Sequence, residues 1–142
     1  MNATRCLAAG LGVAAFGAGC GGEPPSSDTR TAIQLTAEQR NAVLTEMRTM
    51  LGSVSGVLGA AARNDSTGIR GAAHASGMAA AADPELEKLL PEAWLQMAMQ
   101  THLGFDSLAG AGAKGRDTVV ARLGKLTTNC VSCHAMYRLA VR

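Results

Sequence analysis

Apolar residues recur at intervals of three and four along most of this chain, a spacing that places them on one face of a helix. The first helix is predicted from Thr36 to Arg63, and Thr36 followed three residues later by Gln39 matches a capping box. Its buried face is expected to consist of Val43, Leu44, Met47, Leu51, Val54, Leu58 and Ala61. This segment is therefore predicted to be a long amphipathic helix.

The same spacing predicts three more helices, over residues 67–82, from Pro91 to Gly110, and from a cap at Asp117 onward. The inner faces of the last two are predicted to comprise Trp94, Met97, Thr101, Phe105 and Leu108, and Val119, Leu123, Leu126, Cys130, Cys133, His134 and Tyr137. Four amphipathic helices with short connections bury their faces most simply as an antiparallel bundle. The expected fold is all-α, a four-helix bundle over residues 36–142.

Composition agrees with helices and limits the partners. Of 142 residues, 47% are hydrophobic but only 3% are aromatic, so the core is expected to consist of Ala, Leu, Val and Met. The net charge is +2 without a basic run, so nucleic acid is not an expected partner.

Residues 1–20 are predicted to be a secretion signal, with a positive start followed by a short apolar stretch over residues 7–16. That stretch is too short to cross a bilayer, which takes about 20 residues. Gly17-Ala18-Gly19-Cys20 resembles a bacterial lipobox, so we predict a periplasmic lipoprotein anchored through Cys20. The alternative is cleavage nearby, which would release a periplasmic protein with a free Cys20. Residues 21–35 are predicted to be a flexible tether.

The sequence Cys130-Val131-Ser132-Cys133-His134 has the pattern for covalent attachment of a c-type haem. Each thiol adds to one vinyl group of the porphyrin, and the adjacent imidazole becomes the proximal iron ligand. On a helix, residues i, i+3 and i+4 share one face, so Cys130, Cys133 and His134 are expected to point at one macrocycle.

Two other uses of a Cys-x-x-Cys pair fit this sequence less well. A thioredoxin-like redox pair opens a helix after a strand, and no strand-like alternation precedes Cys130. A zinc site needs two further ligands, and no second Cys-x-x-Cys or His-x-x-x-His exists in the chain. Because Cys6 and Cys20 lie in the export signal, no cysteine is left over for a disulfide. Haem attachment is therefore the favoured interpretation.

With this motif on the last predicted helix, the chain resembles the class II c-type cytochromes, the cytochrome c′ family and its low-spin cytochrome c-556 relatives. The ending from Cys130 to Arg138 matches the family, in which an aromatic and a basic residue follow the histidine at the offsets of Tyr137 and Arg138. Arg40-Asn41-Ala42-Val43-Leu44, followed by Leu51-Gly52, resembles the family's haem-facing first helix. The resemblance implies one covalent haem c on the C-terminal helix of the bundle.

The resemblance also implies roles for two residues of the first helix. Arg40 corresponds to an arginine near a haem propionate, with a solvated helix arginine as the plainer interpretation. Leu44 stands where six-coordinate relatives place a methionine ligand, and it has no lone pair to offer. The iron is then expected to be five-coordinate with an aliphatic lid. Ordinary core packing of Leu44 is compatible with this role.

Two other side chains are candidates for a sixth iron ligand. Met47 lies one helical turn from Leu44, although a buried methionine is usually a core residue. His102 is predicted to lie at the flank of the Trp94–Phe105 face, where a histidine is more often partly exposed or hydrogen-bonded.

The resemblance implies a non-enzymatic haem protein of the cell envelope. It would transfer electrons to a partner protein, bind a diatomic gas such as NO or CO, or do both, and relatives often form homodimers. One alternative is a six-coordinate electron carrier similar to cytochrome c-556. A second is a haem enzyme of peroxidase or NO-reducing type, for which His102 is the lone polar distal candidate. A third is an interaction lipoprotein in which the motif is accidental.

Overall fold

The computed structural model describes residues 27–81 and 84–142. It is mostly helical, at 73%, with little strand, which confirms the predicted all-α class. The predicted export signal with Cys20, the first part of the predicted tether and the end of the second predicted helix lie outside the described residues.

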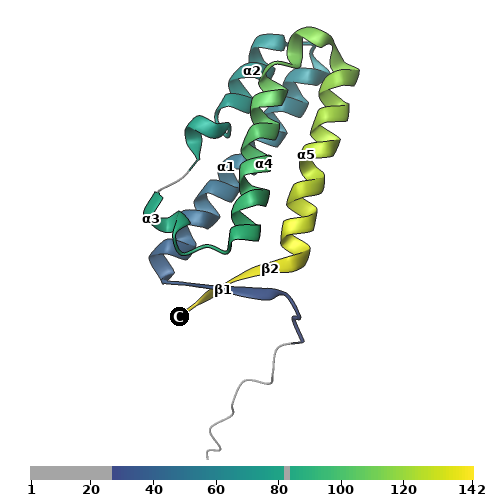
Figure 1. The fold of residues 1–142 in the computed structure, drawn as a ribbon. Helices are drawn as coiled ribbons and strands as arrows, with labels where there is room; N and C mark the ends of the chain where they lie inside the picture. Colours follow the sequence, from purple (N-terminus) through teal and green to yellow (C-terminus); the bar gives the residue numbers. More distant parts are fainter. Residues whose placement is uncertain (1–26, 82–83) are drawn as a thin grey trace, which may run out of the picture.

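Five α-helices follow one another in the described residues, and Figure 1 shows how they are arranged. They are α1 (Ala37–Ala62), α2 (Ser66–His74), α3 (Pro84–Glu87), α4 (Glu92–Ala109) and α5 (Arg116–Met136). Two short strands, β1 (Thr31–Leu35) and β2 (Tyr137–Val141), flank them, and 3-10 turns cover Met78–Ala80 and Gly112–Lys114. Helices α1 and α4 each contact both α2 and α5. Within the described ranges, no helix combines the length and the apolar character that crossing a membrane requires.

Helix α1 begins where the capping box was predicted. The Thr36 hydroxyl accepts a hydrogen bond from the backbone N–H of Gln39 at 3.2 Å, and the Gln39 side chain accepts one from the backbone N–H of Thr36 at 2.9 Å. These bonds satisfy two donors that a helix start would leave unpaired. At the other end, Asn64 adopts a left-handed φ of 56°, and Asp65 caps α2 through the N–H of Gly68. Local side-chain chemistry therefore sets this helix start and the turn into α2.

The hydrophobic core is divided into two clusters. One lies toward α2, where Val57, Ile69, Phe105, Leu108, Val119, Leu123 and Leu126 are buried with several alanines. The other lies toward the strands and contains Ile33, Leu35, Val43, Leu86, Leu90 and Trp94. Side chains between the two clusters are less completely covered, and that region contains the site described below.

The second predicted helix is shorter than expected, because tertiary contacts hold a turn at Ser76 and Gly77. The Ser76 hydroxyl lies 2.8 Å from that of Ser53 on α1, and both side chains are buried. Asp106 on α4 accepts a hydrogen bond from the backbone N–H of Met78 at 3.1 Å. A continuous helix over residues 67–82 could not make these contacts.

Helix α5 also differs from the prediction at both ends. Its N-cap is Gly115, with φ at 94°, rather than Asp117, which lies in the first turn. It ends at Met136, so Tyr137 belongs to strand β2 and not to the inner face of the helix.

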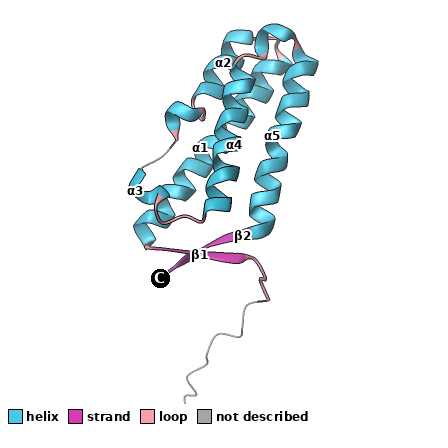
Figure 2. Cartoon of the chain, viewed as in Figure 1, coloured by secondary structure: helices cyan, strands magenta, loops and turns pink. Residues whose placement is uncertain are grey.

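Strands β1 and β2 pair in parallel beneath one end of the helices (Figure 2), with Thr31 opposite Tyr137 and Leu35 opposite Val141. The tether predicted up to residue 35 therefore ends before β1, in which Ile33 is 3% and Leu35 is 0% exposed. The partner strand lies at the far end of the chain, so no local pattern could reveal the pairing.

Candidate functional site

A cavity of about 490 Å³ lies between α1, α4 and α5, in the gap between the two core clusters. Its size falls within the range of about 300–1,000 Å³ that is usual for ligand and cofactor sites. Most of its lining is apolar, including Val43, Val54, Trp94, Met97 and Phe105. The cavity also collects the residues that the sequence singled out, namely Leu44, Met47, His102, Cys130, Cys133 and His134.

Helix α5 brings the motif residues to this cavity as the helical spacing predicted. Cys130 and Cys133 are partly buried free thiols, and Cys130 lies 3.8 Å from the carbonyl of Leu126 on the preceding turn. Burial raises the pKa of both thiols, so both sulfurs are protonated at neutral pH. His134 follows on the same helix and is more exposed. Helix α5 therefore presents two thiols and one imidazole to the cavity.

Part of the predicted buried face of α1 is left uncovered beside this cavity. Leu51 lines the cavity and is 69% exposed, and Leu58, one turn past Val54, is 49% exposed. The prediction that both leucines are core residues is therefore wrong for the described chain. An apolar helical face that borders a cavity fits a flat apolar group, and two thiols and an imidazole on the same cavity are the residues by which a c-type haem would be attached and ligated.

A second cavity of about 240 Å³ adjoins the first and shares Leu44, Met47, Trp94, Cys133 and His134 with it. Its lining also includes Arg30, Arg40 and Arg138. The Nε of Arg138 is buried, has no hydrogen-bond partner among the described residues, and lies 3.8 Å from the Asp28 carboxylate. The guanidinium groups of these arginines make this cavity suited to carboxylates, such as the propionates that a haem would carry.

Arg40, expected near a propionate, lines this second cavity together with Arg30 and Arg138. Sequence reasoning did not find Arg30 or Asp28, which stand before the first helix in a stretch interpreted as a tether. No spacing or motif marks either residue, so no sequence signal could have identified them.

His102 is hydrogen-bonded, which is one of the two states expected at its flank position, and it is buried rather than partly exposed. The residue is 4% exposed, and its Nδ1 lies 3.0 Å from the backbone carbonyl of Ser76. Its Nε2 lies 3.1 Å from Oε1 of Glu46 on α1, and this hydrogen bond raises the pKa of His102. Both ring nitrogens thus have protein partners. Because each nitrogen is already engaged, His102 is disfavoured as an iron ligand.

Leu44 and Met47 lie one turn apart on the part of α1 that lines the cavity. Met47 is partly buried and packs against the cluster that contains Trp94. Leu44 is also partly buried and lines both cavities. An aliphatic side chain and a thioether from α1 therefore line the same cavity as the α5 motif.

Comparisons with protein-family models, with curated proteins and with solved structures found no match for this chain. In the part of the chain that the structure describes, no group of three or more His, Cys, Asp or Glu side chains is arranged to hold a bare metal ion.

Proposed function

We propose that this chain is a c-type haem protein of the bacterial cell envelope that transfers electrons, binds a diatomic gas, or does both. One haem c would be attached through Cys130 and Cys133, with His134 as the iron ligand. Helices α1, α2, α4 and α5 would form the antiparallel four-helix bundle of the cytochrome c′ family. The observation that carries the proposal is that both thiols and the imidazole line the same apolar cavity as Leu44.

The protein side chains would supply attachment, orientation and exclusion of water. Haem, when bound, would supply one-electron redox chemistry and an iron site for small gases. The thiols of Cys130 and Cys133 would fix the edge of the porphyrin, and the apolar wall would exclude water from its faces. Arg40 and Arg138 would offset the negative charge of the propionates, which burial otherwise disfavours.

A five-coordinate iron is the arrangement that the lining of the cavity supports best. Leu44 carries no lone pair, and both nitrogens of His102 are engaged by Glu46 and Ser76. Met47 remains the alternative, which would make the protein a six-coordinate electron carrier similar to cytochrome c-556. An open site suits NO or CO binding, whereas a six-coordinate site favours electron transfer alone.

One observation favours a haem enzyme as a second candidate function. His102 and Glu46 form a hydrogen-bonded pair on the wall of an otherwise apolar cavity, and a peroxidase or NO-reducing centre needs a polar group that moves protons. Haem-dependent turnover of hydrogen peroxide or NO that is lost in His102→Leu would support this function.

The location of the protein in the cell and its membrane anchor are also proposed from its sequence. Cys20 would carry lipid that anchors the domain to the periplasmic face of a membrane, where a redox partner protein or a second copy of the chain would meet it. Metabolic labelling with a radioactive fatty acid, compared between the full chain and Cys20→Ala, tests this anchor.

The decisive experiment is expression of the full chain with the c-type cytochrome maturation machinery. We expect haem that stays on the polypeptide in a denaturing gel and is lost in the double variant Cys130→Ala, Cys133→Ala. The control is Val131→Ala, which changes a residue that lies between them and is 70% exposed. A colourless wild-type protein would overturn the proposal.

Visible spectra of the same protein then test the coordination. High-spin ferrous haem that takes up CO readily is expected for Leu44 over an open site. A low-spin spectrum unchanged by CO would instead indicate a sixth ligand, which Met47→Ala and His102→Ala would identify.

A further inference from the structure

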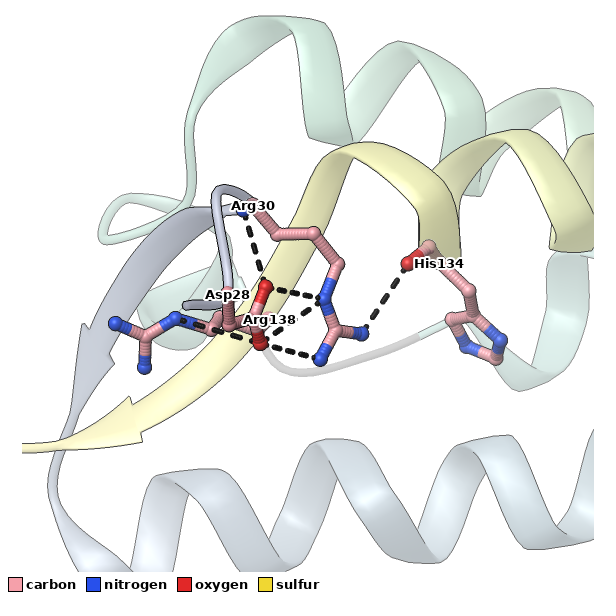
Figure 3. A network of polar contacts seen from close by, with 4 residues as sticks. All are labelled: Asp28, Arg30, His134 and Arg138. Carbon is pink, nitrogen blue, oxygen red and sulfur yellow. Dashed lines mark hydrogen bonds and ion pairs between the residues drawn. The ribbon is translucent and has the colours of Figure 1, made fainter. Parts of the chain in front are cut away.

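The last turn of α5 receives a hydrogen bond from the other end of the chain. His134 lies two residues before the end of α5, where helix carbonyls lack partners within the helix. The backbone N–H of Tyr137 donates to the carbonyl of Cys133. The next carbonyl, that of His134, accepts a hydrogen bond from Nη1 of Arg30 at 3.2 Å (Figure 3).

Arg30 is itself held in place by Asp28. Its Nε and Nη2 donate to the two oxygens of the Asp28 carboxylate at 2.9 and 2.7 Å, and its backbone N–H donates to Oδ1 at 3.1 Å. These bonds with Arg30 lower the pKa of Asp28 to about 2, so the carboxylate is charged at neutral pH. Two such hydrogen bonds between a guanidinium and a carboxylate fix the orientation in which Arg30 contacts the helix.

The backbone on both sides of this contact is also fixed. Strand β1 starts at Thr31, directly after Arg30, and pairs with Tyr137, which directly follows α5. Arg138 adds a second guanidinium on the other side of Asp28, with its Nε 3.8 Å from Oδ2 (Figure 3). The N-terminal segment therefore binds the end of α5 through a strand pair and through a cationic cap, which is favourable at the negative end of a helix.

We propose that Arg30 is a positioning residue for the iron ligand: its guanidinium holds the His134 carbonyl and thereby fixes the turn that aims the imidazole. This role rests on the proposed function, in which His134 binds iron. Arg30 would act through the backbone and would not touch the haem iron.

The test compares Arg30→Gln with Arg116→Gln in the full, haem-loaded chain. Arg116 is a matched control, because it caps the end of α1 in the same way, donating to the carbonyls of Ala61 and Ala62 at 3.2 and 3.1 Å. Amides of residues 133–138 should exchange with deuterium roughly tenfold faster in Arg30→Gln, the scale set by losing a hydrogen bond from a charged group. Arg116→Gln should leave these amides at the wild-type rate.

A spectroscopic signature separates positioning of the ligand from general stability. In the ferrous protein, the iron–histidine stretching band should shift or broaden in Arg30→Gln and stay unchanged in Arg116→Gln. Asp28→Asn removes the anchor but keeps the guanidinium, so it should produce the same change to a smaller extent. It also provides a second variant if Arg30→Gln does not fold.

The outcomes distinguish this proposal from the proposed function. A wild-type chain that never attaches haem overturns the function, and the positioning role is overturned with it. A wild-type chain that binds haem, with an iron–histidine band that neither Arg30→Gln nor Asp28→Asn alters, overturns the role of Arg30 alone. Equal changes in Arg30→Gln and Arg116→Gln would also overturn it, because the effect would then be general loss of stability.

Discussion

The hydrogen-bonded pair formed by the buried His102 and the partly buried Glu46 predicts that the stability of this protein depends on pH. Nδ1 of His102 must carry a proton, because the Ser76 carbonyl 3.0 Å away can only accept. Nε2 faces the Glu46 carboxylate at 3.1 Å, so that contact is favourable only when a proton lies between the two atoms. The hydrogen bond with Glu46 accordingly raises the pKa of His102 above its ordinary value of about 6.5.

The sign of the effect follows from proton binding. A histidine whose folded pKa is raised binds its proton more tightly in the folded state, so its contribution is complete below about pH 6.5 and is lost as the pH rises through the folded pKa. The side chains of His102 and Glu46 are 5% and 23% exposed, so water screens the pair little. A hydrogen bond to a charged group at such a site contributes about 1.5–3 kcal/mol, and we expect a loss of that order across this pH range.

The assay is urea unfolding of the haem-loaded chain across mildly acidic to mildly alkaline pH. Glu46→Gln replaces the carboxylate with an amide that can donate to a neutral Nε2. The variant should therefore stay folded and lose most of the pH dependence. His74→Gln changes an exposed histidine on α2 and should keep the wild-type profile. A wild-type free energy of unfolding that does not fall with rising pH, or a Glu46→Gln profile as steep as wild type, would refute the reasoning.

Three further predictions concern the cavity and the packing. Leu44→Met should give a low-spin ferrous spectrum and weaken CO binding more than about tenfold, because a bound thioether must first leave; unchanged CO titrations would contradict this. Phe105→Ala removes a ring that is 0% exposed and should cost about 3–5 kcal/mol in urea unfolding, against at most about 0.5 for Leu103→Ala, at a residue that is 44% exposed. A Cβ on Gly56 would lie 2.9 Å from that of Ala72, whereas one on Gly52 meets nothing within 4 Å. Thermal melts should therefore show Gly56→Ala destabilised by about 1–3 kcal/mol and Gly52→Ala stabilised by up to about 1 kcal/mol; the reverse order would contradict the close approach of α1 and α2.

Features that depend on neighbours in the sequence were predicted well. The capping box at Thr36 and Gln39 is local, and it sets the start of α1 as expected. The spacing of Cys130, Cys133 and His134 is also local, so a helix alone is enough to bring them to one cavity. The all-α class follows from the same periodicity summed over the chain.

Features that depend on a distant partner were missed or wrong. Thr31–Leu35 lacks any strong strand signal by itself, and it becomes a strand because Tyr137–Val141 lies beside it. His102 is buried because Glu46 and Ser76, from two other elements, satisfy both ring nitrogens. A periodic pattern identifies which side chains can be buried, but it does not identify what covers them.

The candidate site likewise combines features that depend on neighbouring residues with features that depend on distant ones. The sequence by itself determined the three long helices, the thiols and the imidazole, because hydrogen bonds and side-chain spacing within one helix act over a few residues. Only the tertiary structure decided that Leu51 is left uncovered, that Arg30 reaches the carbonyl of His134, and that the core separates into two clusters around a cavity. Those outcomes depend on which surfaces meet when the helices pack, and packing is a property of the whole chain.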